Sequence, residues 1–486
     1  MANLALMIWP LVALVFFASL GRERGLIWAT VVGYLFLPET TAFDLPLLPA
    51  YDKLSALSFG LVLGAVLYRD RRSWPAMAPH VDDSRFFRTL LIGLFVVFSI
   101  AALFTIINNG NALVNGPRVR PGLSMRDLVS MVSGPIILMA PFFLAWRWLS
   151  DEVHHREILL AIMILGLGYS LLALIEIRLS PQINIWVYGF FPHDWRQHIR
   201  GGGFRPVVFL RHGLWLGIFL LMAVMAAFAL FRYTKSGQRI VYLMAGIWLL
   251  AVLLVSRNLG VAMLVVMFLP CLLFLPRVLQ VRITMLVTIL FLAYPVVRQN
   301  NLLPLDGFLN FVSSIDAARA QSLEFRLRNE DEILARAVEK PVFGWGGWGR
   351  NRIIDDKGRD QTVTDGIWVI YISERGWIGY IGFFGILASG LLMSPRMARR
   401  RPVTTVTTVL GLIMAANLIY LVPNSALSPI GWLISGALAS MVQWRPAPVD
   451  ETEDTDDPLG DRRVSRYTRF APQDRAPRPS TRFRRG

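Results

Sequence analysis

The sequence predicts an all-α protein built as a polytopic bundle of membrane-spanning helices. Of its 486 residues, 55% are hydrophobic and 17% are charged, whereas an ordinary soluble protein has about 25% charged residues. Apolar runs close to the ~20 residues that cross a bilayer as a helix recur along the chain. A closed β-barrel would instead show strands of about ten residues with alternating polarity, so these longer, continuous runs indicate helices.

The apolar runs divide residues 1–444 into about thirteen candidate spans, which form the predicted transmembrane domain. Their expected cores are residues 4–20, 25–40, 53–68, 89–107, 127–148, 158–177, 207–231, 240–256, 259–275, 283–297, 367–394, 403–421 and 425–443. The sequence Ser256-Arg257-Asn258 is either the turn of a tight hairpin or a break in one helix, which would reduce the count to twelve. The first run lacks the basic segment of a secretory signal, so we expect it to be retained.

Lys and Arg in the short loops predict the orientation of the spans. When the spans alternate, arginine-rich connections at residues 69–88, 232–239 and 396–401 fall on one side, which we predict to be cytoplasmic. Residues 445–486 join that side. They are acidic and then rich in Arg and Pro, without apolar periodicity, so they are predicted to form a disordered cytoplasmic tail.

The long connections on the outer side carry an unexpected group of cations. The connection at about residues 178–206 leads into RGGGFRPVVFLRHG, where Arg200, Arg205, Arg211 and His212 gather although the positive-inside rule predicts few cations. Arginine presents a planar fork that matches phosphate, and a helix N-terminus also favours anions. We interpret the group as a site for a lipid-linked diphosphate; the alternative is that the arginines reach lipid head groups.

Arg257 interrupts the apolar sequence LLAVLLVSRNLGVAMLVV. A charge at membrane depth is costly and usually faces a polar cavity, which favours a functional role. If the break instead lies at the outer interface, Arg257 belongs to a hairpin turn and the cost falls.

The longest outer connection, about residues 298–365, ends in three further candidates. Trp345 lies in the sequence GWGGWG, where aromatic faces suit either sugar rings or the membrane interface. Asp365 and Glu374 flank the start of the next span, and each is a candidate proton acceptor. The alternatives are a helix N-cap for Asp365 and an ion pair with Arg375 for Glu374.

Several other functions find no support in the sequence. The net charge of +16 comes from arginines between apolar runs and not from a nucleic-acid module, so no nucleic-acid partner is expected. There is no HExxH, GxSxG, Walker A or Cys/His metal spacing, and Cys271 is the single cysteine, so we expect no metal and no cofactor. His193, His198 and His212 face outward and could join the phosphate site.

The order of these motifs resembles the O-antigen ligase and O-antigen polymerase superfamily, which also includes exopolysaccharide polymerases. Three features carry the resemblance: RGGGFRPVVFLRHG, then SRNLGVAMLVV, then a large outer loop before a helix carrying GWIGYIGF. Within that loop Arg326 is followed by Pro341, Gly344 and Gly346 with the spacing R-x14-P-x2-G-x-G. The resemblance covers roughly residues 180–395.

The resemblance implies a helical membrane fold of the GT-C kind in the inner membrane of a bacterium, with the large loop in the periplasm. Members of this superfamily transfer glycan from an undecaprenyl-diphosphate donor to an acceptor hydroxyl at the periplasmic face, without a metal or a nucleotide sugar. The expected partners are therefore the lipid-linked glycan, membrane lipids and other polysaccharide-assembly proteins.

The resemblance also assigns roles to residues, because Arg200 or Arg205, Arg257 and Arg326 match the arginines of the superfamily's motifs. Ligases commonly have His where this chain has Asp365 and Asn where it has Gly366, which is compatible with a polymerase-like member. The residues expected to be catalytic are Asp365, Arg257 and Arg200, and those expected to bind diphosphate or glycan are Arg205, Arg211, His212, Arg326, Trp345 and Glu374.

A flippase for lipid-linked oligosaccharides is the alternative function. It would also use arginines, but in a central cavity and in paired repeats. The sequence has no evident repeat, and its outer cations are concentrated in one loop, which favours an enzyme.

Overall fold

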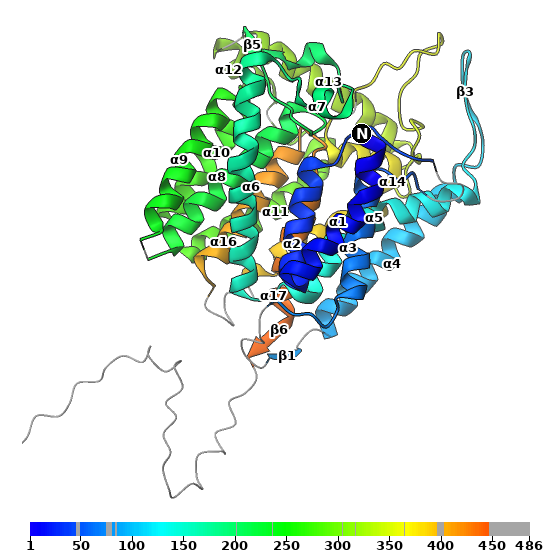
Figure 1. Cartoon of the computed structure of the whole chain (residues 1–486). Coiled ribbons are helices and arrows are strands. Elements are labelled where there is room, and N and C mark those ends of the chain that lie inside the picture. Colours follow the sequence, from blue (N-terminus) through cyan, green and yellow to red (C-terminus); the bar gives the residue numbers. More distant parts are fainter. Residues whose placement is uncertain are drawn as a thin grey trace, which may run out of the picture.

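The computed structural model describes residues 1–44, 49–73, 80–82, 85–200, 202–235, 237–303, 305–315, 317–363, 365–395 and 403–446. This part of the chain is mainly helical, and its helices pack into one bundle (Figure 1). Seven described helices are long and apolar enough to cross a membrane: α1 (Ala2–Leu20), α4 (Arg85–Ile107), α5 (Met125–Trp148), α6 (Glu152–Leu179), α8 (Gly213–Tyr233), α11 (Arg277–Gln299) and α14 (Ile367–Leu392). The predicted mainly helical, multi-pass architecture is confirmed at this level.

The other predicted spans overlap shorter helices. These are α2 (Arg22–Phe36), α3 (Lys53–Leu67), α9 (Arg239–Val255), α10 (Leu259–Phe274), α16 (Thr405–Leu421) and α17 (Pro429–Gln443). The long connections between helices add α7 (Ile183–Tyr188), the 3₁₀ helix η1 (Trp195–His198), α12 (Leu305–Ile315) and α13 (Ala317–Val338).

The chain also forms short strands, which the all-α prediction did not include. Three antiparallel pairs are described: β1 (His80–Asp82) with β6 (Trp444–Pro446), β2 (Leu113–Asn115) with β3 (Arg118–Arg120), and β4 (Ile199–Arg200) with β5 (Gly203–Phe204). The first pair includes two residues of the segment predicted to be a disordered tail. Residues 447–486 of that segment, and residues 396–401 of an arginine-rich connection, lie outside the described residues.

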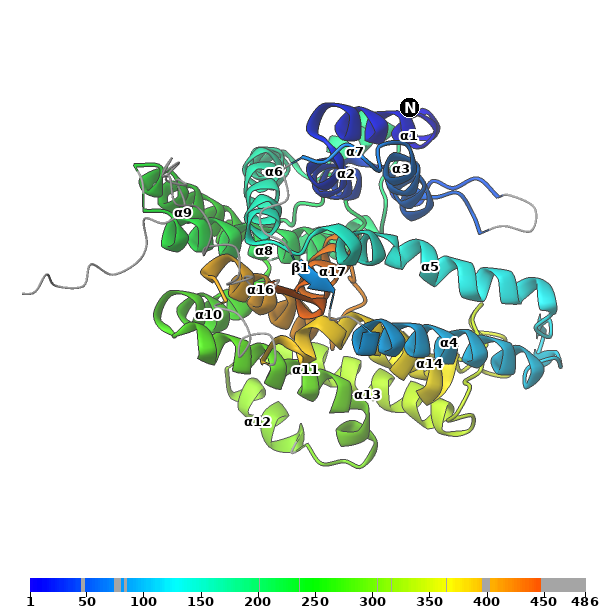
Figure 2. The same ribbon diagram turned by 90° about the horizontal axis from the view of Figure 1, so that it is seen from below.

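The helix ends sort to two sides of the bundle. One side, which we call the loop end, carries α7, α12, α13 and the N-terminus, and the other, the tail end, carries β1 and β6 (Figure 1). At the tail end, Arg22 N–H donates to Arg71 O, and His155 Nδ1 lies 2.9 Å from Thr407 Oγ1. Seen from below, α8, α16 and α17 lie between α1–α3 and α10–α12 (Figure 2).

The Ser256–Asn258 break is a hairpin turn at the loop end. Asn258 Nδ2 donates to Gly213 O at the start of α8 (3.2 Å), so this turn lies beside the loop end of α8. At the other end of α8, Arg232 donates to Leu272 O near the end of α10. Helices α9 and α10 therefore cross the bundle separately beside α8, as the thirteen-span alternative predicts. Arg257 consequently lies at the end of the bundle and not at its mid-depth.

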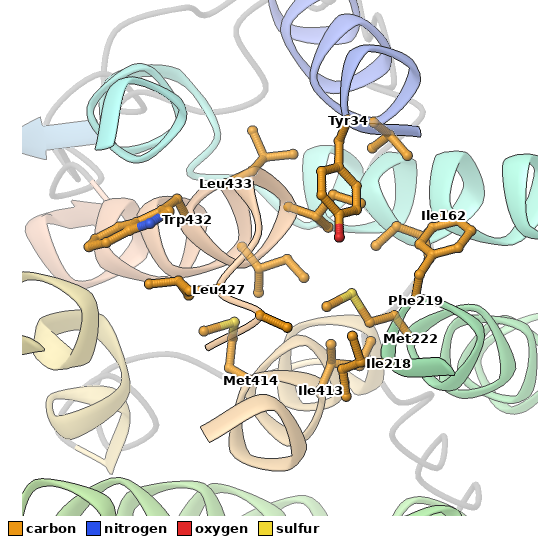
Figure 3. Close-up of a cluster of buried hydrophobic side chains, with 14 of the residues drawn as sticks. Tyr34, Ile162, Ile218, Phe219, Met222, Ile413, Met414, Leu427, Trp432 and Leu433 are labelled. Carbon is orange, nitrogen blue, oxygen red and sulfur yellow. The ribbon is translucent and has the colours of Figure 1, made fainter. Parts of the chain in front are cut away.

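Apolar side chains fill the middle of the bundle. Figure 3 shows them converging from α2, α6, α8, α16 and α17, with Tyr34, Phe219, Met414 and Trp432 among those labelled. Helix α8 is buried almost all round, because residues of every face from Leu216 to Leu230 are covered. Such a helix is typical of the centre of a large membrane bundle.

Helix α14 breaks at Gly376, and the large loop docks onto the break. Gly376 has φ +64°, and a Cβ there would lie 2.2 Å from Val342 O. Across the break, Trp345 N–H donates to Ser373 O (2.8 Å), Gly346 N–H to Glu374 O (2.9 Å), and Trp377 N–H to Pro341 O (2.8 Å). The predicted continuous span 367–394 is thus interrupted, and the loop satisfies backbone groups that the interruption frees.

A buried carboxylate on α6 holds the chain that leads into α8. Glu176, 1% exposed, accepts hydrogen bonds from the N–H groups of Ile183 (3.0 Å), Val207 and Val208 (both 2.7 Å). Val208 is held at φ +57°, a conformation that β-branched residues rarely adopt. This anchor fixes where Arg205 and His212 enter the bundle.

We expect the Glu176→Ala variant to be strongly destabilised, because three buried N–H groups would lose their acceptor. Each buried donor left without an acceptor costs about 1–3 kcal/mol, so the free energy of unfolding should fall by at least ~3 kcal/mol. The measurement is the melting temperature of the purified full chain in detergent. Glu176→Gln keeps one carbonyl oxygen and should lose less. The control is Glu324→Ala at an exposed position of α13, expected within about 0.5 kcal/mol of the wild type. Equal melting of Glu176→Ala and the control would contradict this anchor.

Candidate functional site

Two pairs of predicted site residues meet at the loop end, on either side of the end of α16. One pair, Arg205 and Arg257, lies where α8 begins and where the α9–α10 hairpin turns. The other, Arg326 and Asp365, joins α13 to the residues just before α14. Tyr420, near the end of α16, donates to Leu214 O at the start of α8 (2.8 Å), and Arg326 Nη1 donates to Pro423 O just beyond α16 (3.4 Å), so both pairs lie beside the end of α16.

Close backbone packing brings Arg205 and Arg257 together. Arg205 Nη2 donates to Arg257 O at 3.4 Å. A Cβ on Gly213 would lie 2.4 Å from Cγ and Cδ of Arg205, and a Cβ on Gly203 would lie 2.7 Å from Cζ and Nη2 of Arg257. Both arginine side chains therefore rest on glycines, where no larger residue fits. Arg257 itself is at φ +59°, which points to a constrained turn.

Arg326 and Asp365 form a partly exposed ion pair. Arg326 Nε lies 3.8 Å from Asp365 Oδ2, and the side chains are 36% and 40% exposed. Arg326 Nη1 also donates to Pro423 O at 3.4 Å, which directs the guanidinium toward the end of α16. The exposure leaves both groups accessible to a ligand.

Asn329 and Gly366 set the position of Asp365. Asn329 Oδ1 accepts from Val363 N–H at 2.8 Å, which ties the segment before Asp365 to α13. A Cβ on Gly366 would lie 2.4 Å from Val422 O, so only glycine allows this approach of the chain to α16. The close approach to Val422 O thus explains why glycine occupies position 366, where ligases commonly have Asn.

Glu330 is a candidate that the sequence analysis missed. It is 6% exposed, one helical turn from Arg326, and its Oε2 lies 3.9 Å from Nε of the buried Arg298. Arg298 makes a closer contact with Asp331 Oδ1, at 2.7 Å. Burial raises the pKa of Glu330 to about 7, and the nearby charge of Asp365 adds to the rise while Arg298 and Arg326 oppose it. The sequence did not distinguish Glu330 from the many other charged residues of α13. Which face of that helix is buried depends on tertiary packing.

The remaining arginines of RGGGFRPVVFLRHG are less defined. The backbone of Arg200 pairs with Gly203 in the β4–β5 hairpin, while its side chain and Gly201 lie outside the described residues. Arg211 is exposed, and His212 caps α8, because its Nδ1 accepts from Leu214 N–H at 3.0 Å.

Trp345 and Glu374 belong to a different set of contacts, at the break in α14. Trp345 is 7% exposed, with the Arg336 guanidinium 3.4 Å and the Lys340 ammonium 4.4 Å from its ring centroid. Its ring is thus covered by cations, and the glycines beside it serve the docking onto α14. The residue after Glu374, Arg375, donates to Met131 O at 2.7 Å.

Three histidines of the loop end, which the sequence separates, meet beside the start of α8. The ring centroids of His198 and His212 are 4.6 Å apart, those of His193 and His212 are 4.8 Å apart, and those of His193 and His198 are 5.7 Å apart. Burial lowers the pKa of His198 to about 4, and the neighbouring His193 and Arg205 also lower it. His198 is therefore neutral at neutral pH and adds no positive charge for a phosphate.

The pKa of Glu330 predicts a specific pH dependence of stability. Between pH 4.5 and 7 the unfolded chain releases a proton that the folded chain retains, so this group's contribution to the free energy of unfolding falls as pH rises through that window. Glu330→Gln lacks this loss. The difference in free energy of unfolding between Glu330→Gln and the wild type should therefore shift by about 2–3 kcal/mol in favour of the variant as pH rises from 4.5 to 8. Melting temperatures across this range measure the difference.

The control for this measurement is Glu332→Gln on the same helix, whose side chain is 38% exposed. Its melting curve should follow the wild type at every pH. If the Glu330→Gln profile also ran parallel to the wild type, Glu330 would titrate as an ordinary carboxyl.

Comparison with known proteins adds no assignment to this geometry. No family model matches the chain, and neither a curated protein nor a solved structure is significantly similar to it.

Proposed function

We propose that the chain is a membrane glycosyltransferase that transfers or polymerises glycan from an undecaprenyl-diphosphate-linked donor onto an acceptor hydroxyl. The observation that carries the proposal is that two pairs, Arg205 with Arg257 and Arg326 with Asp365, both lie beside the end of α16. The motif order that resembles O-antigen ligases and polymerases supports it independently. The protein then belongs to a bacterial inner membrane, has a GT-C-like fold and turns its loop end to the periplasm.

In this proposal the arginines stabilise the leaving group. When the bond between the anomeric carbon and the diphosphate oxygen breaks, negative charge grows on the diphosphate. Guanidinium groups already held in place, by Gly203 and Gly213 on one side and Pro423 on the other, can stabilise that charge without reorganising. The permanent charge and fork geometry of arginine suit this role better than those of lysine.

Asp365 then serves as the proton acceptor for the incoming hydroxyl. The hydroxyl oxygen bonds to the anomeric carbon, its proton passes to Asp365, and direct displacement inverts the configuration at that carbon. Asp365 is the accessible carboxyl of the pair, while Glu330 is buried behind Arg326.

The distribution of charge supports an enzyme over a flippase. The described interior between α2, α6, α8, α16 and α17 is filled by apolar side chains, whereas the site residues lie at one end of the bundle. A flippase would require charged groups facing a central path in both halves of the protein.

Glycan profiling of a deletion strain tests the proposal. Single repeats without long chains indicate a polymerase, and long lipid-linked glycan that never reaches its acceptor indicates a ligase. Accumulation of lipid-linked repeats on the cytoplasmic side would instead establish the flippase function.

Arg326→Ala should lower glycan transfer by about 10²–10³-fold, in the range found when one preorganised donor to a transition-state charge is removed. Arg326→Lys should recover only part of the activity, because it restores charge without the fork. Arg328→Ala is the matched control: it lies two residues away on α13, is 71% exposed and pairs only with Glu332 among described residues. Transfer by purified protein in lipid nanodiscs measures both, and equal rates for Arg326→Ala and Arg328→Ala would contradict this role.

Asp365→Asn should lower the rate by about 10²–10⁴-fold, as expected for loss of a general base. The wild-type rate should fall at acidic pH, because a general base must be deprotonated to accept a proton. Equal rates for the wild type and Asp365→Asn would argue against a carboxyl base.

A further inference from the structure

The histidines at the loop end form a cluster that the proposed transfer reaction does not use. One potential ligand nitrogen from each of His193, His198 and His212 lies within 4.8 Å of the other two. They come from separate parts of the chain: the turn after α7, the end of η1 and the N-cap of α8. We propose that these three histidines bind a divalent transition-metal ion.

The geometry is close to that of a three-histidine site. With metal–nitrogen bonds of about 2.0–2.1 Å and tetrahedral angles, the three nitrogens lie about 3.3 Å apart and the ring centroids about 5 Å apart. The observed centroid separations are 4.6, 4.8 and 5.7 Å. Two of the three ring separations thus lie close to the value that a shared metal ion requires, and the third is longer.

Contacts around the rings leave nitrogens available for a metal. His198 Nδ1 lies 3.0 Å from Asp194 O, so this nitrogen carries the proton and Nε2 presents its lone pair. A histidine ligand typically donates its second N–H to a carbonyl in this way. His193 Nδ1 is buried and has no hydrogen-bond partner among the described residues, a costly state that a metal would relieve.

Two of the three rings already make hydrogen bonds that a metal would replace. Gly213 N–H reaches His198 Nε2 at the long distance of 3.4 Å, and Leu214 N–H reaches His212 Nδ1 at 3.0 Å. The second bond caps α8, and losing a cap costs about 1 kcal/mol. Metal–imidazole bonds are much stronger, so this exchange does not prevent binding.

The ligand set indicates the class of ion. Three imidazoles without a thiolate or carboxylate suit Zn²⁺, Cu²⁺, Ni²⁺ or Co²⁺ and not the oxygen-preferring Mg²⁺ or Ca²⁺. Three protein ligands also leave a fourth position for water or another small ligand.

Binding would order the chain that carries Arg205. His198 O accepts from Arg205 N–H at 2.8 Å, and the Arg205 side chain rests on Gly213, next to His212. An ion shared by His198 and His212 would join these two segments directly. The metal is thus assigned a structural role, and its presence does not depend on the proposed transfer activity.

The test is metal binding by the full-length protein, purified metal-free with a tag that contains no histidine. We expect one Zn²⁺ per chain by elemental analysis after dialysis, and a higher melting temperature in Zn²⁺ than in chelator. Co²⁺ should give the visible absorption bands of a four-coordinate site. Mg²⁺ at the same concentration should change neither.

His193→Gln is the decisive variant, because its Nδ1 makes no bond that the folded chain needs. It should weaken Zn²⁺ binding more than about 100-fold, since loss of a partner outside the ligand shell already costs about 10–100-fold. Its melting temperature in chelator should equal that of the wild type, which establishes folding without the metal. His154→Gln at the tail end is the control, because Gln also serves at this position of a capping box.

The proposal is overturned if the wild type binds no Zn²⁺ or if His193→Gln binds it as tightly. It is also overturned if Co²⁺ gives only the weak spectrum of a six-coordinate surface ion. Unequal melting of His193→Gln and wild type in chelator calls for His212→Asn, which retains a cap, as the second variant. If His212→Asn also retained wild-type affinity, the cluster would not be a metal site.

Discussion

Three backbone N–H groups, from Ile183, Val207 and Val208, end on the buried carboxylate of Glu176. Buried donors of this kind must be satisfied, and Glu176 is the acceptor for all three. The carboxylate therefore determines the path of the chain between α6 and α8. Arg205 and the three histidines lie on that path, so the geometry of the loop end follows from one interaction on the helix beneath it.

The loop end combines two kinds of arginine environment. Arg205 and Arg257 are held by close contact with glycine backbone, while Arg326 is held by a carbonyl and by the ion pair with Asp365. The first kind fixes a guanidinium by packing against backbone, and the second pairs a guanidinium with a carboxylate. In the proposed reaction, the arginines beside the end of α16 bind the diphosphate and Asp365 accepts the proton.

Apolar run length was sufficient to predict the helices, because a span must satisfy its backbone internally whatever its neighbours are. The sequence did not distinguish a hairpin at Arg257 from a break within one helix, since both alternatives place the same residues in the same order. Trp345 was misleading in a different way: the glycines around it allow backbone contact with α14, and its ring is covered by Arg336 and Lys340. Glu330 and the histidine cluster depend on contacts between distant segments, which no local pattern reports.

The break at Gly376 links the large loop to the membrane bundle more closely than a surface appendage would be. Because the loop segment from Pro341 to Gly346 supplies partners for Ser373 O and Glu374 O, it completes the backbone of α14 much as an added strand completes a sheet. Deletion or displacement of that segment would leave the carbonyl oxygens of Ser373 and Glu374 without these donors. This part of the large loop and helix α14 therefore form a single structural unit.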